Sequence, residues 1–148
     1  MLFWLAWKFH VLLKSSIIVG FFKITQGAFF GKLGKGCKFY GIIRFGNVAS
    51  NIYVGESCSF GKGVFLSASR NAYISIGNGC SINTGGHIVS VDKIEIENGV
   101  AIGEYVTIRD QNHRFDSLDA TIREQGYNSG PVKIGKNTII GPHTVIDK

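Results

Sequence analysis

The chain has 148 residues, a net charge of +6 and a hydrophobic content of 45%, which is enough for one globular domain with one core. Its 20 glycines recur beside aliphatic residues and only 2 prolines accompany them, so the collagen and disordered low-complexity classes are excluded. The lysines and arginines are scattered singly, without the basic stripe that nucleic acid requires. The charge therefore favours a phosphate-rich cofactor or an acidic lipid surface over nucleic acid.

Residues 1–30 form the first predicted segment, which begins apolar and aromatic but is interrupted by polar residues. No apolar run reaches the roughly 18 residues of a spanning helix. A signal peptide is not favoured, because no basic residue precedes the apolar stretch and Lys14 divides it. Trp4 and Trp7 beside lysines are typical of a helix in the plane of a membrane surface; a helix that caps the next domain is a compatible alternative. We expect a cytoplasmic protein with peripheral contact at the inner face of the membrane.

A six-residue repeat runs from Leu33 to the end of the chain. Each unit begins with an aliphatic or aromatic residue, often followed by glycine, and carries a small or β-branched residue four places after the first. Such a fixed period indicates a solenoid. The clear units are LGKGCK (33–38), VGESCS (54–59), FGKGVF (60–65), IGNGCS (76–81), IENGVA (96–101), IGEYVT (102–107), IGKNTI (134–139) and IGPHTV (140–145).

The hexads group in threes, which predicts a triangular coil with one hexad on each side. The leftover residues number 3, 4, 2 and 20 and all fall at one corner, after the third hexad. We expect the first residue of each hexad to point inward, and glycine in the next place to allow a positive φ near a tight corner. Strands of successive coils, about 4.8 Å apart, would bury their apolar sides against one another. The predicted coils begin at Leu33, Val54, Ile76, Ile96 and Ile134.

The three cysteines occupy equivalent places, the fifth position of the first hexad in three successive coils. Cys37, Cys58 and Cys80 should therefore stack as a ladder of small residues in the core. Their odd number and the lack of a CxxC pair make zinc binding and disulfide formation weak alternatives. Residues 31–148 are thus predicted to form an all-β parallel β-helix, preceded by the N-terminal helix.

This repeat resembles the hexapeptide-repeat acyltransferase family over residues 33–148, in particular its galactoside-, maltose- and polysaccharide-type O-acetyltransferases. The resemblance implies a left-handed β-helix, which departs from the usual right-handed crossover, and a homotrimer with active sites between subunits. It also implies acetyl-CoA as co-substrate, no metal, and a sugar or lipid-linked glycan as acceptor. Scaffold proteins and carbonic-anhydrase-like enzymes share the repeat, so it specifies the fold more closely than the chemistry.

The segment IRDQNHRFD (108–116) ends the fourth coil and opens an extended loop at 114–133. It resembles the family segment in which a histidine just before such an excursion is the catalytic base, which implies that role for His113. The chemistry fits, because a neutral imidazole can take the proton of a sugar hydroxyl as that hydroxyl attacks a thioester. The ordinary histidine pKa of about 6.5 leaves the neutral form abundant.

Four further residues are candidates for acceptor binding. Asn83 falls where relatives carry an asparagine that contacts the acceptor, although asparagine also suits the left-handed backbone of a coil corner. Asp110 and Asn112 are expected either to orient the catalytic histidine or bind sugar hydroxyls, or to be solvated turn residues. Asp116 is expected to shape the acceptor pocket from the loop, together with Arg114 and Arg123.

The family places acetyl-CoA between two solenoids, with its pantetheine arm parallel to their axis. On that resemblance Gly141 and Thr144 would meet the thioester and the pantetheine, and a backbone N–H there would stabilise the oxyanion. Lys148 would meet the CoA phosphates. Relatives continue for two further coils beyond this position, so we expect a shortened C-terminal end or another capping device.

A zinc site is not favoured, although His87, His113 and His143 are three potential ligands. The carbonic-anhydrase-like relatives carry two histidines five residues apart, and here that place is taken by Leu118.

Three functions remain open from the sequence. The first is acetyl transfer to a sugar hydroxyl in the synthesis of capsule, O-antigen or exopolysaccharide, and the retained NHRFD segment (112–116) favours it. The second is acylation of the amine of a nucleotide-linked amino sugar. The third is a non-catalytic or truncated β-helix scaffold.

Overall fold

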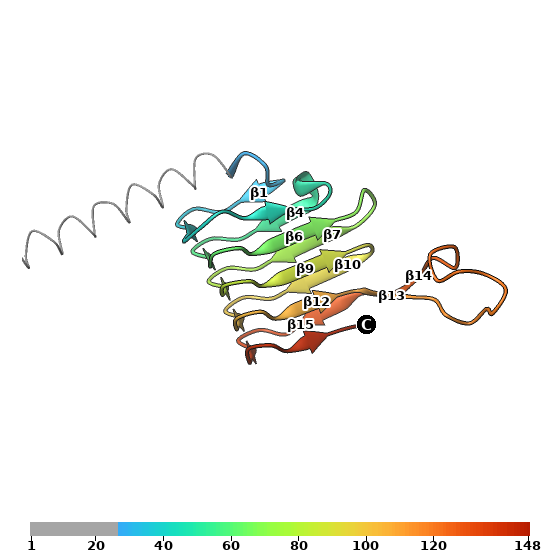
Figure 1. The fold of residues 1–148 in the computed structure, drawn as a ribbon. Coiled ribbons are helices and arrows are strands. Elements are labelled where there is room, and N and C mark those ends of the chain that lie inside the picture. The colour runs from blue at the N-terminus through green and yellow to red at the C-terminus, as the bar shows by residue number, and fades with distance from the viewer. Residues whose placement is uncertain (1–26) are drawn as a thin grey trace, which may run out of the picture.

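The computed structural model describes residues 27–148, and the predicted N-terminal helix falls almost wholly on residues 1–26, outside them. The described chain is a β-solenoid of stacked three-sided coils, each of which adds one parallel strand to each of three sheets (Figure 1). The prediction of an all-β fold with parallel stacked coils is confirmed. Within residues 27–148 no helix is long and apolar enough to cross a membrane.

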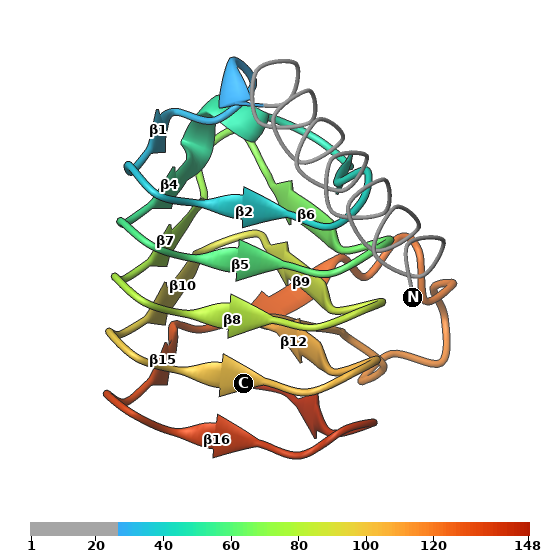
Figure 2. The same ribbon diagram turned by 90° about the vertical axis from the view of Figure 1, so that its left-hand side faces the viewer.

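Each of the three sheets contains five strands, one above another along the solenoid axis (Figure 2). The first sheet consists of β1 (Lys32–Leu33), β4 (Ile52–Val54), β7 (Tyr73–Ile76), β10 (Lys93–Ile96) and β15 (Val132–Ile134). The second consists of β2 (Lys38–Phe39), β5 (Ser59–Phe60), β8 (Ser81–Ile82), β11 (Ala101–Ile102) and β16 (Ile139–Ile140). The third consists of β3 (Arg44–Phe45), β6 (Phe65–Ala68), β9 (His87–Ser90), β12 (Thr107–Arg109) and β17 (Val145–Ile146).

Two smaller elements lie outside these sheets. A single 3-10 turn, η1 (Ala49–Asn51), precedes β4. The strands β13 (Gln111–His113) and β14 (Tyr127–Ser129) form a separate antiparallel pair between β12 and β15.

The strand register matches the predicted coils residue by residue. The first residues of successive coils are paired in the first sheet: Leu33 with Val54, Val54 with Ile76, Ile76 with Ile96, and Ile96 with Ile134. A slip of one residue would turn every inward side chain of a strand to the solvent. The aliphatic first position of each hexad therefore determines how the coils stack.

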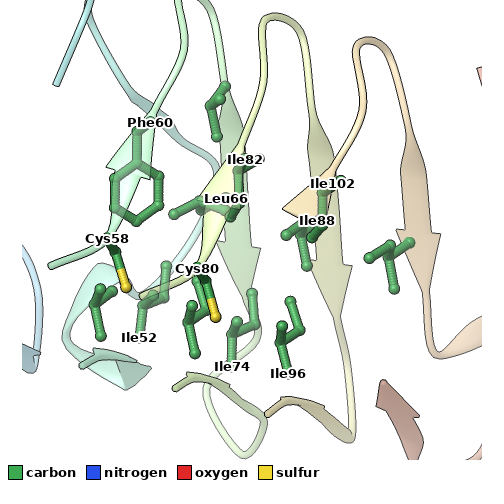
Figure 3. Close-up of a cluster of buried hydrophobic side chains, with 14 of the residues drawn as sticks. Ile52, Cys58, Phe60, Leu66, Ile74, Cys80, Ile82, Ile88, Ile96 and Ile102 are labelled. Atoms are coloured by element: carbon green, nitrogen blue, oxygen red, sulfur yellow. The ribbon is translucent and has the colours of Figure 1, made fainter. Parts of the chain in front are cut away.

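The core is a set of apolar columns inside the triangle, with Phe60, Ile82 and Ile102 stacked along the second sheet (Figure 3). These side chains are almost completely buried. At the first coil the columns become aromatic: Phe39 stacks on Phe60 with ring centroids 5.2 Å apart, and Phe30 covers them from the preceding turn. This aromatic cluster closes the N-terminal end of the core.

The cysteine ladder is part of this core, as predicted. Cys37, Cys58 and Cys80 are buried and free. Each thiol donates to a carbonyl oxygen of the next coil, at 3.2 Å to Gly55, 3.0 Å to Gly77 and 3.1 Å to Glu97 respectively. The side-chain interaction with Cys80 and, after it, burial raise the pKa of the Cys58 thiol. The ladder is therefore a packed structural feature of the core.

The role predicted for the glycine in the second place of each hexad is wrong. Gly55 and Gly77 do not have positive φ; the left-handed residues lie two places later, at Ser57 and Gly79. A Cβ at Gly55 would lie 2.7 Å from the carbonyl carbon of Gly77, and one at Gly77 would lie 2.7 Å from the amide nitrogen of Asn98. Close approach of the next coil, and not backbone conformation, therefore requires glycine there.

The residues in excess of three hexads lie at one corner, between the third sheet and the first, as the sequence predicts. Their positions are shifted, however, because the strands of the first sheet begin one to three residues before the predicted start of each coil. The extra residues are those between β3 and β4, β6 and β7, β9 and β10, and β12 and β15. The last of these connections carries the long insertion.

Candidate functional site

The long insertion is an arm that projects from the stack after β12 (Figure 1). Its base is the antiparallel pair of β13 and β14, in which His113 lies opposite Tyr127. The sequence places His113 at the end of the fourth coil and the loop at 114–133. The structure corrects this: the wall of the coil ends with β12, and His113 lies on the arm, outside the stack.

Asp110 is the residue at which the chain leaves the coil, and its side chain is completely buried. Its carboxylate accepts hydrogen bonds from the hydroxyl of Ser90 at 2.5 Å and from the amides of Val91 at 2.9 Å and Asp92 at 3.0 Å. Its carbonyl accepts from the amide of Gly130 at 3.0 Å, on the returning side of the arm. Asp110 thus ties both ends of the arm to the preceding coil, and its carboxylate does not reach the surface.

His113 is exposed on the arm, where its ring contacts that of Tyr127 with centroids 4.4 Å apart. The two rings face an open hollow of about 530 Å³. The lining residues are Asn112, His113, Arg114, Phe115, Asp116, Tyr127, Asn128 and Lys148. Three of the predicted acceptor and cofactor residues, Asn112, Asp116 and Lys148, therefore lie around the predicted base.

Arg114 and Asp116 form an ion pair in this hollow, with Nη2 and Oδ2 2.7 Å apart. The guanidinium holds the pKa of the Asp116 carboxyl below its usual range. The other carboxylate oxygen accepts from the amide of Phe115 at 3.1 Å. An ionised carboxylate and a fixed guanidinium are therefore available to hydroxyl groups of a ligand.

Asn112 connects the arm to the residues that follow β17, the last strand of the solenoid. Its side-chain amide donates to the carboxylate of Asp147 at 2.9 Å, and the same carboxylate oxygen accepts from the amide of Lys148. Asn112 therefore helps to place Lys148 beside the arm, and its amide nitrogen is already engaged within the chain.

The remaining predicted residues lie at a different corner, between the second and third sheets. Asn83 follows β8, and its side-chain amide donates to Glu104 at 3.1 Å. It lines a second hollow of about 330 Å³ that shares no residue with the hollow around His113. Gly141 and Thr144 lie at the same corner of the last coil, where the Thr144 hydroxyl donates to the Gly141 carbonyl at 2.8 Å. One chain therefore does not bring these three residues to His113.

Three residues around His113 were not identified from the sequence: Phe115, Tyr127 and Asn128. They lie in the insertion, where the hexad period gives no information. The segment Tyr127–Ser129, which pairs with β13, is nevertheless bounded by Gly126 and Gly130, as many strands are. These flanking glycines were the sequence signal available for it.

The other histidines of the described chain are in ring stacks. His87 stacks on Phe65 with centroids 4.6 Å apart, and His143 stacks on Tyr105 at 5.3 Å. Within residues 27–148 no three side chains of His, Cys, Asp or Glu are grouped as metal ligands would be.

Comparison of the chain with protein-family models, curated proteins and solved structures gave no significant match.

Proposed function

We propose that this chain is an acetyl-CoA-dependent O-acetyltransferase that acts on a sugar hydroxyl in the synthesis of a surface polysaccharide. The observation that carries this proposal is the exposed His113, which an anchored arm holds beside a polar hollow at the edge of a β-solenoid. The hexad resemblance supports a left-handed winding of the coils and the assignment to acyl transfer.

His113 is the general base in this reaction. Its neutral imidazole takes the proton of the acceptor hydroxyl while the oxygen attacks the carbonyl carbon of the acetyl thioester. The tetrahedral intermediate then collapses, the carbon–sulfur bond breaks, and the imidazolium returns the proton to the CoA sulfur. The ring contact with Tyr127 limits the orientations of the imidazole, which favours a productive geometry.

The hollow supports a sugar as the acceptor. Asn128 and the Arg114–Asp116 pair offer donors and acceptors to hydroxyl groups, and Phe115 and Tyr127 offer aromatic faces to the apolar face of a pyranose. The sugar would be part of a lipid-linked glycan at the cytoplasmic face of the membrane, with residues 1–30 in peripheral contact with the lipid.

A homotrimer would complete the site. The arm that carries His113 leaves the solenoid at one corner, whereas Asn83, Gly141 and Thr144 lie at another. Cyclic packing of three solenoids would bring the first corner of one chain to the second corner of its neighbour. Acetyl-CoA would lie in that groove, with its thioester near Gly141 and its phosphates near Lys148.

The direct test is transfer of radiolabelled acetyl groups from acetyl-CoA to a panel of sugar acceptors. We expect His113→Gln to lower kcat by about 10²- to 10⁴-fold, the usual contribution of a general base. The matched control, His87→Gln, removes a histidine from the outer face of a sheet and should retain activity. Equal activity of His113→Gln and the native chain would contradict this role.

A further inference from the structure

The charges of this chain are separated along the solenoid axis. The first acidic residue is Glu56, whereas seven basic residues precede it. Four of these seven lie on the first described coil: Lys32, Lys35, Lys38 and Arg44. The positions look scattered in the sequence, but the fold gathers them at one end.

The basic residues of the first coil surround this end. Lys32 is on β1, Lys38 on β2 and Arg44 on β3, which are the terminal strands of the three sheets (Figure 2). Lys35 is on the turn between β1 and β2. The charges therefore form a ring that includes all three sides of the coil.

The three lysines of this ring are exposed and have no acidic partner in the described chain. Two lysines further along the solenoid are paired: Lys93 with Glu95 at 3.0 Å, and Lys133 with Glu97 at 2.8 Å. Acidic residues thus offset part of the positive charge of the later coils, whereas the first coil contains no acidic residue.

Large apolar side chains are exposed at the same end of the solenoid. Phe29 precedes β1 and is 59% exposed, and Ile42 lies at the corner between β2 and β3 and is 62% exposed. Val48, before η1, is 36% exposed. An end surface that combines unpaired lysines with protruding apolar side chains has the two components of peripheral membrane binding, electrostatic attraction and shallow insertion.

We propose that the first coil docks end-on to an anionic lipid membrane. Phe29 and Ile42 enter the interface between headgroups and acyl chains, while Lys32, Lys35 and Lys38 contact the lipid phosphates. The solenoid then stands away from the membrane, and the arm, which leaves after the fourth coil, lies roughly 15 Å further along the axis at about 4.8 Å per coil. This docking does not depend on acetyl transfer.

A membrane fits this surface better than nucleic acid does. Nucleic-acid sites align basic side chains along a groove or one face, whereas these residues encircle the end of a rod that also exposes apolar side chains. A flat anionic surface can contact the whole ring at once.

Co-sedimentation of the full chain with lipid vesicles tests the proposal. The vesicles contain phosphatidylcholine alone or phosphatidylcholine with phosphatidylglycerol. We expect binding only with the anionic lipid and a steep loss of binding between low and physiological salt. The triple variant Lys32→Gln, Lys35→Gln, Lys38→Gln should bind on the order of a hundredfold more weakly, because each lysine near such a surface contributes several-fold.

A charge-matched control separates the first coil from net charge. The variant Arg123→Gln, Lys133→Gln, Lys136→Gln removes the same charge from the arm and the last coil, and should bind as the native chain does. Ile42→Ser should weaken binding several-fold without changing the thermal unfolding curve. Equal binding of the two triple variants, equal binding to neutral vesicles, or binding to duplex DNA without binding to vesicles would overturn the proposal.

Discussion

The hydroxyl of Ser90 donates a 2.5 Å hydrogen bond to the carboxylate of Asp110, and both residues are completely inaccessible to solvent. A carboxylate can be buried in an apolar core only where hydrogen bonds replace its hydration. Asp110 meets this condition with three donors from one turn of the preceding coil. The arm that carries His113 is therefore fixed at its base by a buried polar cluster.

Replacing this carboxylate should loosen the arm. We expect Asp110→Ala to lower the free energy of unfolding by about 3 kcal/mol, because it removes the acceptor of three hydrogen bonds, two of them from backbone amides. Urea denaturation measures the change. Asp119→Ala, at an exposed position of the arm, should stay within about 0.5 kcal/mol of the native chain. Equal stability of the two variants would show that Asp110 does not anchor the arm.

The cysteine ladder should accept valine. Val100 occupies the position that Cys80 holds one coil earlier, since the residues that follow them, Ser81 and Ala101, are paired. We expect Cys80→Val to cost less than about 1.5 kcal/mol and to retain acetyl transfer, whereas the larger Cys80→Leu should cost about 1–3 kcal/mol through overpacking. Loss of transfer in a stable Cys80→Val protein would reveal a chemical role for the thiol.

The stability of the solenoid should fall in mild acid because of His87. Burial, together with the charges of Arg109 and Arg44, lowers the pKa of this histidine below its ordinary value of 6.5. The unfolded chain therefore binds the proton more readily, so stability is fully present above pH 6.5 and decreases as the pH falls below it. His87→Phe keeps the stack on Phe65 but cannot titrate.

The urea midpoint of unfolding, measured at pH 7.5 and pH 5.5, gives the comparison. The native chain should lose more stability between these values than His87→Phe does. The same loss in both proteins would assign the pH dependence to other groups.

If two chains build each site, inactive variants should complement one another. His113→Ala and Asn83→Ala each remove one side of the groove, but a mixed trimer contains some grooves with both native residues. In trimers refolded from an equal mixture of the two denatured variants, about one groove in four contains both native residues. We therefore expect up to about a quarter of the native activity. Sedimentation of the mixture checks that trimers form. No recovery from well-assembled mixed trimers would contradict a site built by two neighbouring chains.

The coils were predictable because a periodic constraint acts on every one of them. The pairing of Leu33, Val54, Ile76 and Ile96 follows from the need to bury one aliphatic residue per side, and local sequence expresses that need directly. The glycine after each of the first three was expected to allow a positive φ. The structure requires it for another reason, because close approach between coils is a tertiary property.

The site was only partly predictable. His113 was found through its segment, but its position on an arm depends on the burial of Asp110 beneath residues some twenty positions earlier. Tyr127 and Asn128 reach the hollow through the antiparallel pairing of β13 and β14. No period connects the two strands of that pair, so long-range contacts alone determine which residues meet.

The most direct test of the central claim is a calorimetric titration of the full chain with acetyl-CoA, with the oligomeric state measured on the same sample. We predict saturable binding with one site per chain in a trimer. His113→Ala should bind acetyl-CoA with unchanged affinity, because in the proposed mechanism the histidine acts on the acceptor hydroxyl. A folded trimer that shows no heat of binding with acetyl-CoA would contradict the assignment to acetyl transfer and leave the β-solenoid as a scaffold.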